Sequence, residues 1–196
     1  MSESKSRLHF DLCRILEGMA PTAGEFHASV LALFRGDDFS SSEILLTKRS
    51  QTVVTHVGQV AFPGGRIEVE DRFDPVRTAI REANEETGIP RSCIRPAGFM
   101  PQVPTVTSGF FVIPVLAALD PGIQSESIAL IPDPNEVERA AWVPVSALRA
   151  SRREEPFSVK GREIQLPVFS WEEERVWGLT ALIFDSILRR YDSLKP

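Results

Sequence analysis

The chain has 196 residues, of which 42% are hydrophobic and 25% charged, and its formal net charge is −5. This composition is that of an ordinary soluble globular protein, and the length suits one α/β domain over residues 1–196. The negative net charge and the lack of a basic stripe argue against a nucleic-acid-binding surface. No apolar run approaches the ~20 residues that span a bilayer, and the first residues lack the apolar core of a secretory signal. We therefore expect a cytoplasmic protein with no nucleic-acid or membrane partner.

The predicted elements alternate between strands and a few helices. Apolar residues at helical spacing predict a helix over about 6–18 and a terminal helix over about 179–191. Asp74 followed by Pro75 predicts the start of a third helix, which runs to residue 87 and stops at Gly88. Strand-like runs occupy five further ranges: 27–35, 42–50, 109–119, 139–145 and 162–169. This order predicts an α/β fold in which helices cover a mixed sheet.

The helix over 75–87 carries three glutamates, Glu82, Glu85 and Glu86, which the helical rotation places in one sector. Arg81 lies one turn before Glu85 and can pair with it, which leaves Glu82 and Glu86 free. Hard divalent ions such as Mg²⁺ prefer oxygen ligands of this kind. A solvated acidic face is the ordinary alternative, so the helix alone decides little. Four residues at helical spacing are expected to form the buried stripe of this helix: Val76, Ala79, Ile80 and Ala83. All of its other residues are expected to face solvent.

The loop before this helix adds a second feature, the Phe-Pro-Gly-Gly sequence at 62–65 followed by acidic residues. Together with REANEETGI at 81–89, it resembles the Nudix box: Gly, five residues, Glu, seven residues, then Arg-Glu-apolar-x-Glu-Glu-x-Gly-apolar. The helical half matches except for the small Ala83 at the apolar slot. In the loop half, Asp71 replaces Glu, and nine residues instead of seven separate it from Arg81. The resemblance implies a Nudix-type α/β/α sandwich with a central mixed sheet and the motif at 65–89.

Flanking segments resemble the coenzyme A diphosphatase branch of this family. LLTKRSQTVVTHVGQVAFPGG at 45–65 resembles its LLTxRS…HxGQVAFPGG segment, although QTVVTH lacks the usual second arginine. PTVTSGFFVIPVLA at 104–117 and LPVFSWEEERVWGLTA at 166–181 resemble two later stretches, so the similarity covers about 28–190. It implies metal-dependent hydrolysis of the diphosphate bond of coenzyme A or its derivatives, which releases (acyl-)4′-phosphopantetheine. Hydrolysis of another nucleoside diphosphate derivative, such as NADH or ADP-ribose, and a binding module without catalysis are the alternatives.

The resemblance also implies a metal site with Mg²⁺ or Mn²⁺ as cofactor. Glu82 and Glu86 would hold the ions, with the Gly65 carbonyl as an extra ligand. Glu85 would either ligate as well or clamp Arg81. Glu82 is the first choice for the base that takes the proton of the attacking water. The alternatives for that base are the other nearby carboxylates: Asp71, Glu68 and Glu136.

Substrate phosphates need cations on the same rim of the site. Arg49 is the first candidate because the guanidinium fork suits a phosphate, and Lys48 and Arg66 follow. His56 would hydrogen-bond a phosphate or orient a loop, and Ser108 would shape a wall near the pantetheine arm or adenine. For each charged residue the alternative is a solvated surface group, and for His56 a half-buried structural histidine.

The aromatic residues are expected mainly in the core. Trp177 and the pair Phe110 and Phe111 are assigned to packing, with the outward-facing member of the pair lining a pocket. Many relatives dimerise, which leaves a homodimer open, and no feature of the sequence fixes an interface.

Overall fold

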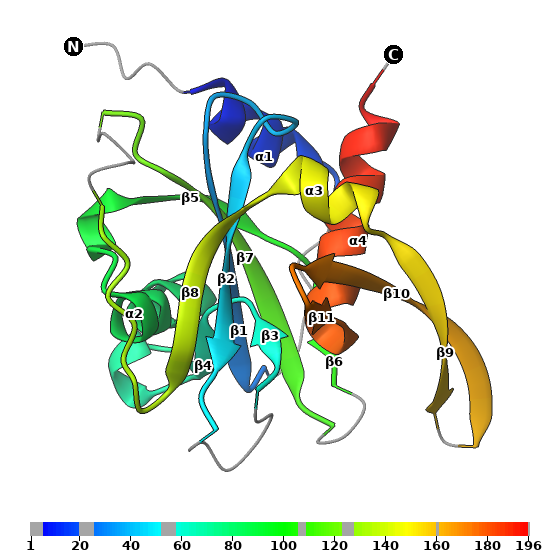
Figure 1. Ribbon diagram of the computed structural model, residues 1–196. Coiled ribbons are helices and arrows are strands. Elements are labelled where there is room, and N and C mark those ends of the chain that lie inside the picture. The colour runs from blue at the N-terminus through cyan, green and yellow to red at the C-terminus, as the bar shows by residue number, and fades with distance from the viewer. Residues whose placement is uncertain are drawn as a thin grey trace.

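The computed structural model describes residues 6–19, 26–51, 58–105, 109–122, 128–159 and 161–195. Its main sheet has the order β3-β2-β1-β7-β5, with β4 beside β1, β6 beside β7 and β8 beside β2 (Figure 1). β1 and β7 run parallel and the other pairs of this sheet antiparallel, so the sheet is mixed. The strand bounds are β1 (Ala28–Arg35), β2 (Glu43–Arg49), β3 (Val60–Ala61), β4 (Gly64–Arg66), β5 (Ile94–Phe99), β6 (Val103–Pro104), β7 (Phe111–Leu119) and β8 (Val137–Pro144).

Helices cover both faces of this sheet. Alternate side chains of a strand point to opposite faces. Leu31 and Leu33 of β1 accordingly pack in the cluster that contains α2, and Phe34 packs with α1 and α4 (Figure 1). The helix bounds are α1 (Arg7–Leu16), α2 (Pro75–Thr87), α3 (Val145–Ala150) and α4 (Gly178–Ser193), with 3₁₀ turns η1 (Val69–Asp71) and η2 (Arg91–Cys93). The predicted α/β/α sandwich with a central mixed sheet is confirmed. None of the described helices combines the length and apolar character needed to cross a bilayer.

The bounds of α2 agree with the prediction because local signals set them. The Asp74 side chain accepts a hydrogen bond from the Val76 N–H, Pro75 is the first helical residue, and Gly88 ends the helix at φ 74°. The predicted division of its faces was wrong. Buried positions extend beyond the apolar stripe to four polar residues: Thr78, Arg81, Glu86 and Thr87. The helix lies against β4 as well as β1, and polar neighbours from other elements cover three of these side chains: Asp71 accepts hydrogen bonds from Thr78 and Arg81, and Arg49 lies beside Glu86.

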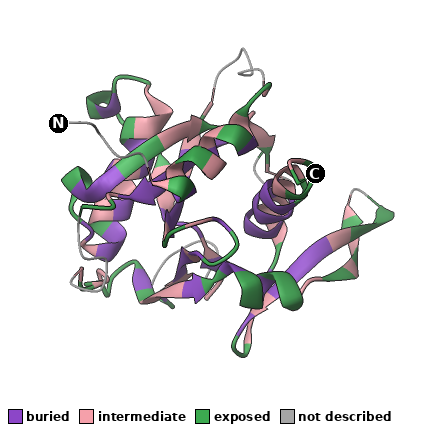
Figure 2. Ribbon diagram, turned by 90° about the horizontal axis from the view of Figure 1, so that it is seen from above, coloured by how far each residue is buried: buried purple, intermediate pink, exposed green. Residues whose placement is uncertain are grey.

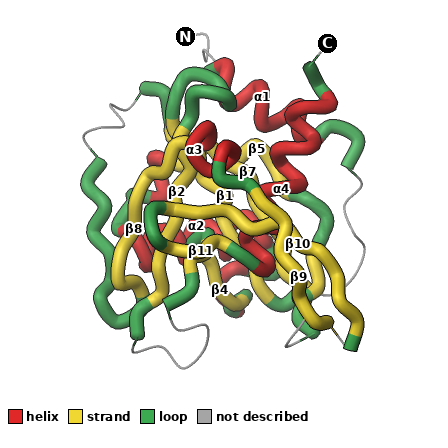
Figure 3. The backbone as a smooth tube through the Cα atoms, turned by 45° about the vertical axis from the view of Figure 1, so that its right-hand side comes forward, coloured by secondary structure: helices red, strands yellow, loops and turns green. Residues whose placement is uncertain are grey.

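A second, three-stranded sheet forms an arm beside the sandwich (Figure 3). It consists of β9 (Arg153–Val159), β10 (Arg162–Trp171) and β11 (Glu174–Val176). The inner half of β10 is buried and its outer half is exposed, as Figure 2 shows for the projecting hairpin. The sequence predicted a strand at 162–169 but not its partner β9, because REEPFSV is charged and contains a proline, both unfavourable in a strand.

Candidate active site

The glycine pair of β4 lies directly against α2. The Glu82 carboxylate sits so close to Gly65 that any side chain there would overlap it. A side chain at Gly64 would overlap the backbone of β1, and the Gly64 backbone lies close enough to the Glu86 carboxylate to lower the pKa of that group. Both glycines are therefore needed for close approach, one to a carboxylate and one to a neighbouring strand. The sequence predicted a flexible turn here, whereas the structure has a short strand that touches both glutamates.

Glu86 is a buried carboxylate with one unsatisfied oxygen. Its residue exposure is 2%, and Oε2 has no hydrogen-bond partner. The other oxygen, Oε1, lies 3.7 Å from Nη1 of Arg49 at the end of β2. Burial raises the pKa of Glu86 to about 8, although the Arg49 charge opposes the shift. Burial also raises the pKa of Glu82, against the opposing charge of Arg81. Two carboxylates that water no longer stabilises form an environment that favours a bound cation.

Arg81 holds the acidic side chains of this site together. Its Nε donates to Oδ1 of Asp71 and its Nη2 to Oδ2, each at 3.0 Å. Nη2 also donates at 3.0 Å to the Arg66 carbonyl. Nη1 lies 2.9 Å from both Glu82 and Glu85. The predicted pair with Glu85 is confirmed. The expectation that Glu82 remains free of Arg81 was wrong, because the buried guanidinium spans both carboxylates.

Asp71 is the anchor of that arginine. It is 3% exposed, and besides Arg81 its Oδ2 accepts hydrogen bonds from Thr78 Oγ1 at 2.9 Å and from the Glu68 N–H at 3.0 Å. The Arg81 hydrogen bonds hold the pKa of Asp71 at about 2. A carboxylate of this kind binds a proton too weakly to act as a general base near neutral pH, so the geometry favours a positioning role.

The two extra residues between Asp71 and the helix are accommodated by an unusual turn. Arg72 and Phe73 both adopt left-handed backbone conformations, with φ 56° and 57°. Few non-glycine residues adopt this region, and each costs of order 1 kcal/mol or more. The turn brings Asp71 back to Arg81, so the altered spacing of the loop half still delivers a carboxylate to the arginine.

The remaining predicted residues are distributed unevenly. Lys48 pairs with Glu138 of β8 at 3.1 Å and with Glu174 of β11 at 2.8 Å. Arg66 is exposed, with its guanidinium over the Phe110 ring. Glu85 is half exposed. Three further candidates are exposed or lie outside the described residues: Glu136 is exposed, and His56 and Ser108 are not described.

The donor set fits a divalent cation in part. No group of three or more His, Cys, Asp or Glu side chains suited to a metal ion occurs within the described ranges. The unpartnered, buried Oε2 of Glu86 nevertheless supplies an oxygen that nothing else satisfies, and Glu82 lies one helical turn away against Gly65. Such a pair suits Mg²⁺, which takes one or two protein carboxylates and completes its shell with water and substrate phosphates.

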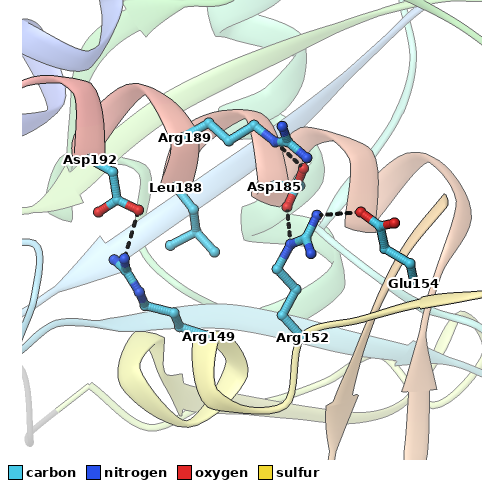
Figure 4. A pocket seen from close by; sticks show the side chains of 7 residues that line it. All are labelled: Arg149, Arg152, Glu154, Asp185, Leu188, Arg189 and Asp192. Atoms are coloured by element: carbon cyan, nitrogen blue, oxygen red, sulfur yellow. Dashed lines mark hydrogen bonds and ion pairs between the residues drawn. The ribbon is translucent and has the colours of Figure 1, made fainter. Parts of the chain in front are cut away.

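A separate pocket of about 380 Å³ lies between α3 and α4, away from these residues (Figure 4). Its charged side chains pair with one another. Asp185 accepts from Arg152 at 2.6 Å and from Arg189 at 2.7 Å, and Asp192 pairs with Arg149 at 2.6 Å. These contacts join α4 to the segment around α3, so the pocket is a structural junction. None of the predicted site residues lines it.

The mixed-sheet sandwich and its glycine strand against a helix of carboxylates define a hydrolase of the Nudix type. The NUDIX domain model matches residues 25–161, and the chain belongs to the Nudix family. Nudix hydrolases are pyrophosphatases that act on nucleoside diphosphate derivatives and generally use divalent ions such as Mg²⁺ or Mn²⁺. The predicted family and enzyme class are thereby confirmed.

Relatives support this assignment at two levels. Over 146 residues the chain is 36% identical to the protein named "Uncharacterized Nudix hydrolase NudL" of Pectobacterium atrosepticum, covering 74% of this chain and 72% of that relative. The crystal structure of the MutT protein from Methanosarcina mazei superposes with a TM-score of 0.55 at 17% identity, covering 89% of this chain and 99% of that one. The NUDIX domain of Shewanella oneidensis NrtR, solved with ADP ribose, gives a TM-score of 0.52 at 14% identity, covering 89% and 95%. The two structural matches support the fold alone.

Proposed function

We propose that the protein hydrolyses the diphosphate of coenzyme A or its derivatives, giving 3′-phospho-AMP (adenosine 3′,5′-bisphosphate) and (acyl-)4′-phosphopantetheine. The main support for this proposal is that segment 45–65, whose sequence resembles the coenzyme A diphosphatase branch, contributes residues to the candidate site. That segment supplies Arg49 beside Glu86 at 3.7 Å and the glycine pair against α2. The part of the sequence that resembles the branch is thus part of the wall of the candidate site.

Glu82 and Glu86, with the Gly65 carbonyl, are the residues proposed to hold Mg²⁺ or Mn²⁺. When bound, the ion neutralises diphosphate charge and lowers the pKa of a coordinated water. The support for this assignment is the unpartnered Oε2 of Glu86 and the contact between Glu82 and Gly65. Glu85 is half exposed and pairs with Arg81, so we assign it to clamping the arginine.

The other residues bind and orient. Arg49 is proposed to contact the diphosphate, because its guanidinium reaches Glu86 and is only 26% exposed. Arg81 fixes the Glu82 carboxylate, and Asp71 in turn fixes Arg81. Glu82 remains our assignment for the general base. Asp71 is not retained for that role, since both of its oxygens are occupied.

The substrate is tested by a panel of coenzyme A, 3′-dephospho-coenzyme A, NADH and ADP-ribose, with Mg²⁺ and product identification by mass spectrometry. We expect kcat/KM for coenzyme A to exceed that for NADH and ADP-ribose by about tenfold or more, because contacts to groups those substrates lack add transition-state binding. The products of coenzyme A should be 3′-phospho-AMP and 4′-phosphopantetheine. A preference for NADH or ADP-ribose would transfer the assignment to that substrate, and the absence of any hydrolysis would favour a binding module.

A further inference from the structure

We propose that an aromatic ladder at the end of β1 and β7 is the binding platform for the nucleobase of the substrate. The ladder consists of Arg66, Phe110, His27 and Phe111, in that order. The Arg66 guanidinium lies 5.2 Å from the Phe110 ring centroid. The Phe110 and His27 rings stack at 4.8 Å with an interplanar angle of 9°. His27 and Phe111 follow at 6.3 Å and 26°. This inference rests on the proposed class of substrate, a nucleoside diphosphate derivative.

The ladder begins next to the candidate diphosphate site. Gly65 of β4 faces Glu82, and the adjacent Arg66 therefore points to the opposite face of the sheet, where it covers Phe110. The Arg66 carbonyl is itself bound by Arg81. A ligand whose diphosphate lies at the carboxylates thus needs to pass only the edge of β4 to reach the rings.

The ladder is too exposed to be ordinary core. His27 and Phe111 are both exposed, with Phe111 at 36%, whereas the next residues of β7, Val112 and Ile113, are buried. The sequence assigned the two phenylalanines to packing, with the outward one lining a pocket. In this order the faces of Phe110 and His27 are covered by their neighbours, so the outer face of Phe111 is the one on which a planar base would stack. Base–aromatic stacking is tolerant of base identity.

His27 adds a directed hydrogen-bond donor. The Phe111 N–H donates to its Nδ1 at 3.2 Å, so the neutral ring carries its proton on Nε2. The Nε2–H can donate to a ring nitrogen or carbonyl of a base, or to a ribose oxygen. An acyl chain or a pantetheine arm has no aromatic plane and would not require stacked rings.

A rival aromatic cluster lies on the arm, where Phe157 and Trp177 stack at 5.9 Å. There the Arg175 guanidinium lies over both rings, at 5.1 Å and 5.4 Å from their centroids, and it also pairs with Glu155. In the ladder the Arg66 guanidinium lies over Phe110, at the opposite end from Phe111. We therefore assign base stacking to the ladder and use Trp177 as the comparison.

The test is calorimetric binding of ADP, which carries a base, and of inorganic pyrophosphate, which does not. Phe111→Leu is expected to weaken ADP binding about tenfold and pyrophosphate binding less than twofold, because only stacking is removed. His27→Ala should act in the same direction. Trp177→Leu should change neither affinity more than twofold. Circular dichroism establishes that each variant is folded, and His27→Ala serves if Phe111→Leu does not fold.

Loss of ADP binding in Trp177→Leu but not in the ladder variants would overturn the proposal, as would equal loss of ADP and pyrophosphate binding in the ladder variants. Both readouts are independent of hydrolysis. If the ladder variants bind ADP normally, the substrate preference measured with the coenzyme A panel is unaffected. If the panel shows a different preferred substrate, the effect of the ladder variants on ADP binding is unaffected.

Discussion

Replacing Glu86 by Gln is expected to lower turnover of the preferred substrate by about 10³-fold while leaving the protein folded. The amide has the shape of the carboxylate but lacks the charge that a divalent ion requires, and stabilisation of developing charge accounts for effects of this size. Because Glu86 is 2% exposed, a neutral side chain removes the need to bury an ionised group. The midpoint of thermal unfolding should therefore not fall. Steady-state kinetics with Mg²⁺ measure turnover, and thermal melts without added divalent ion measure stability, because bound metal would itself stabilise the wild type.

The matched control is Glu70→Gln, the same chemical change on the exposed η1 turn of the same loop. We expect its kcat/KM to stay within twofold of wild type. Normal hydrolysis by the Glu86 variant would remove that residue from the reaction. A large loss in both variants would indicate a general electrostatic effect of the acidic surface.

Replacing Asp71 by Asn is expected to cost about 3 kcal/mol of unfolding free energy at neutral pH. Arg81 would remain buried with its main partner neutralised, and removing one member of a buried pair has costs of this order. Activity should fall as well, since Arg81 positions Glu82. Denaturant titration gives the stability. Asp74→Asn, a neighbouring N-cap where Asn serves as well as Asp, should change stability by less than about 0.5 kcal/mol.

The stabilisation by Asp71 has a defined pH dependence. Its folded pKa, about 2, lies below the ordinary value of 3.8. The stabilising contribution is therefore complete above the unfolded pKa and disappears as the pH falls through the folded one. The shift corresponds to about 2 kcal/mol. The stability difference between wild type and Asp71→Asn should shrink between about pH 4 and pH 2. A difference that stays constant across this window would contradict the buried pair.

Local signals predicted α2 accurately, whereas contacts between distant residues decided its polar face. Asp74, Pro75 and Gly88 act within one turn of the helix ends, so their effect can be read from the sequence. The Glu86 carboxylate is buried instead beside the backbone of Gly64, which lies more than twenty positions earlier in the chain. A helical wheel cannot include that neighbour, and the buried face was therefore predicted as too narrow.

Two features of the site could not be predicted from the sequence. Lys48 pairs with Glu138 and Glu174, whereas Arg49 pairs with Glu86 of α2. The pairing of β2 with β8 is irregular between these two residues, so strand alternation does not predict which of them reaches α2. Counting from Gly65 along the motif identified Asp71 but not its partner Arg81. The path from Asp71 to α2 depends on two residues with left-handed backbone conformations, Arg72 and Phe73. Such conformations of non-glycine residues have no clear sequence signature.

The most direct test of the account is a calorimetric titration of Mn²⁺ into the wild type and Glu86→Gln, each with and without ADP. The account predicts metal uptake by the wild type that ADP strengthens, and at least a tenfold weaker affinity in the variant, because one of two charged ligands is lost. Equal Mn²⁺ affinity in the two proteins would contradict the assignment of Glu86 as a metal ligand, and with it the proposed basis of diphosphate hydrolysis.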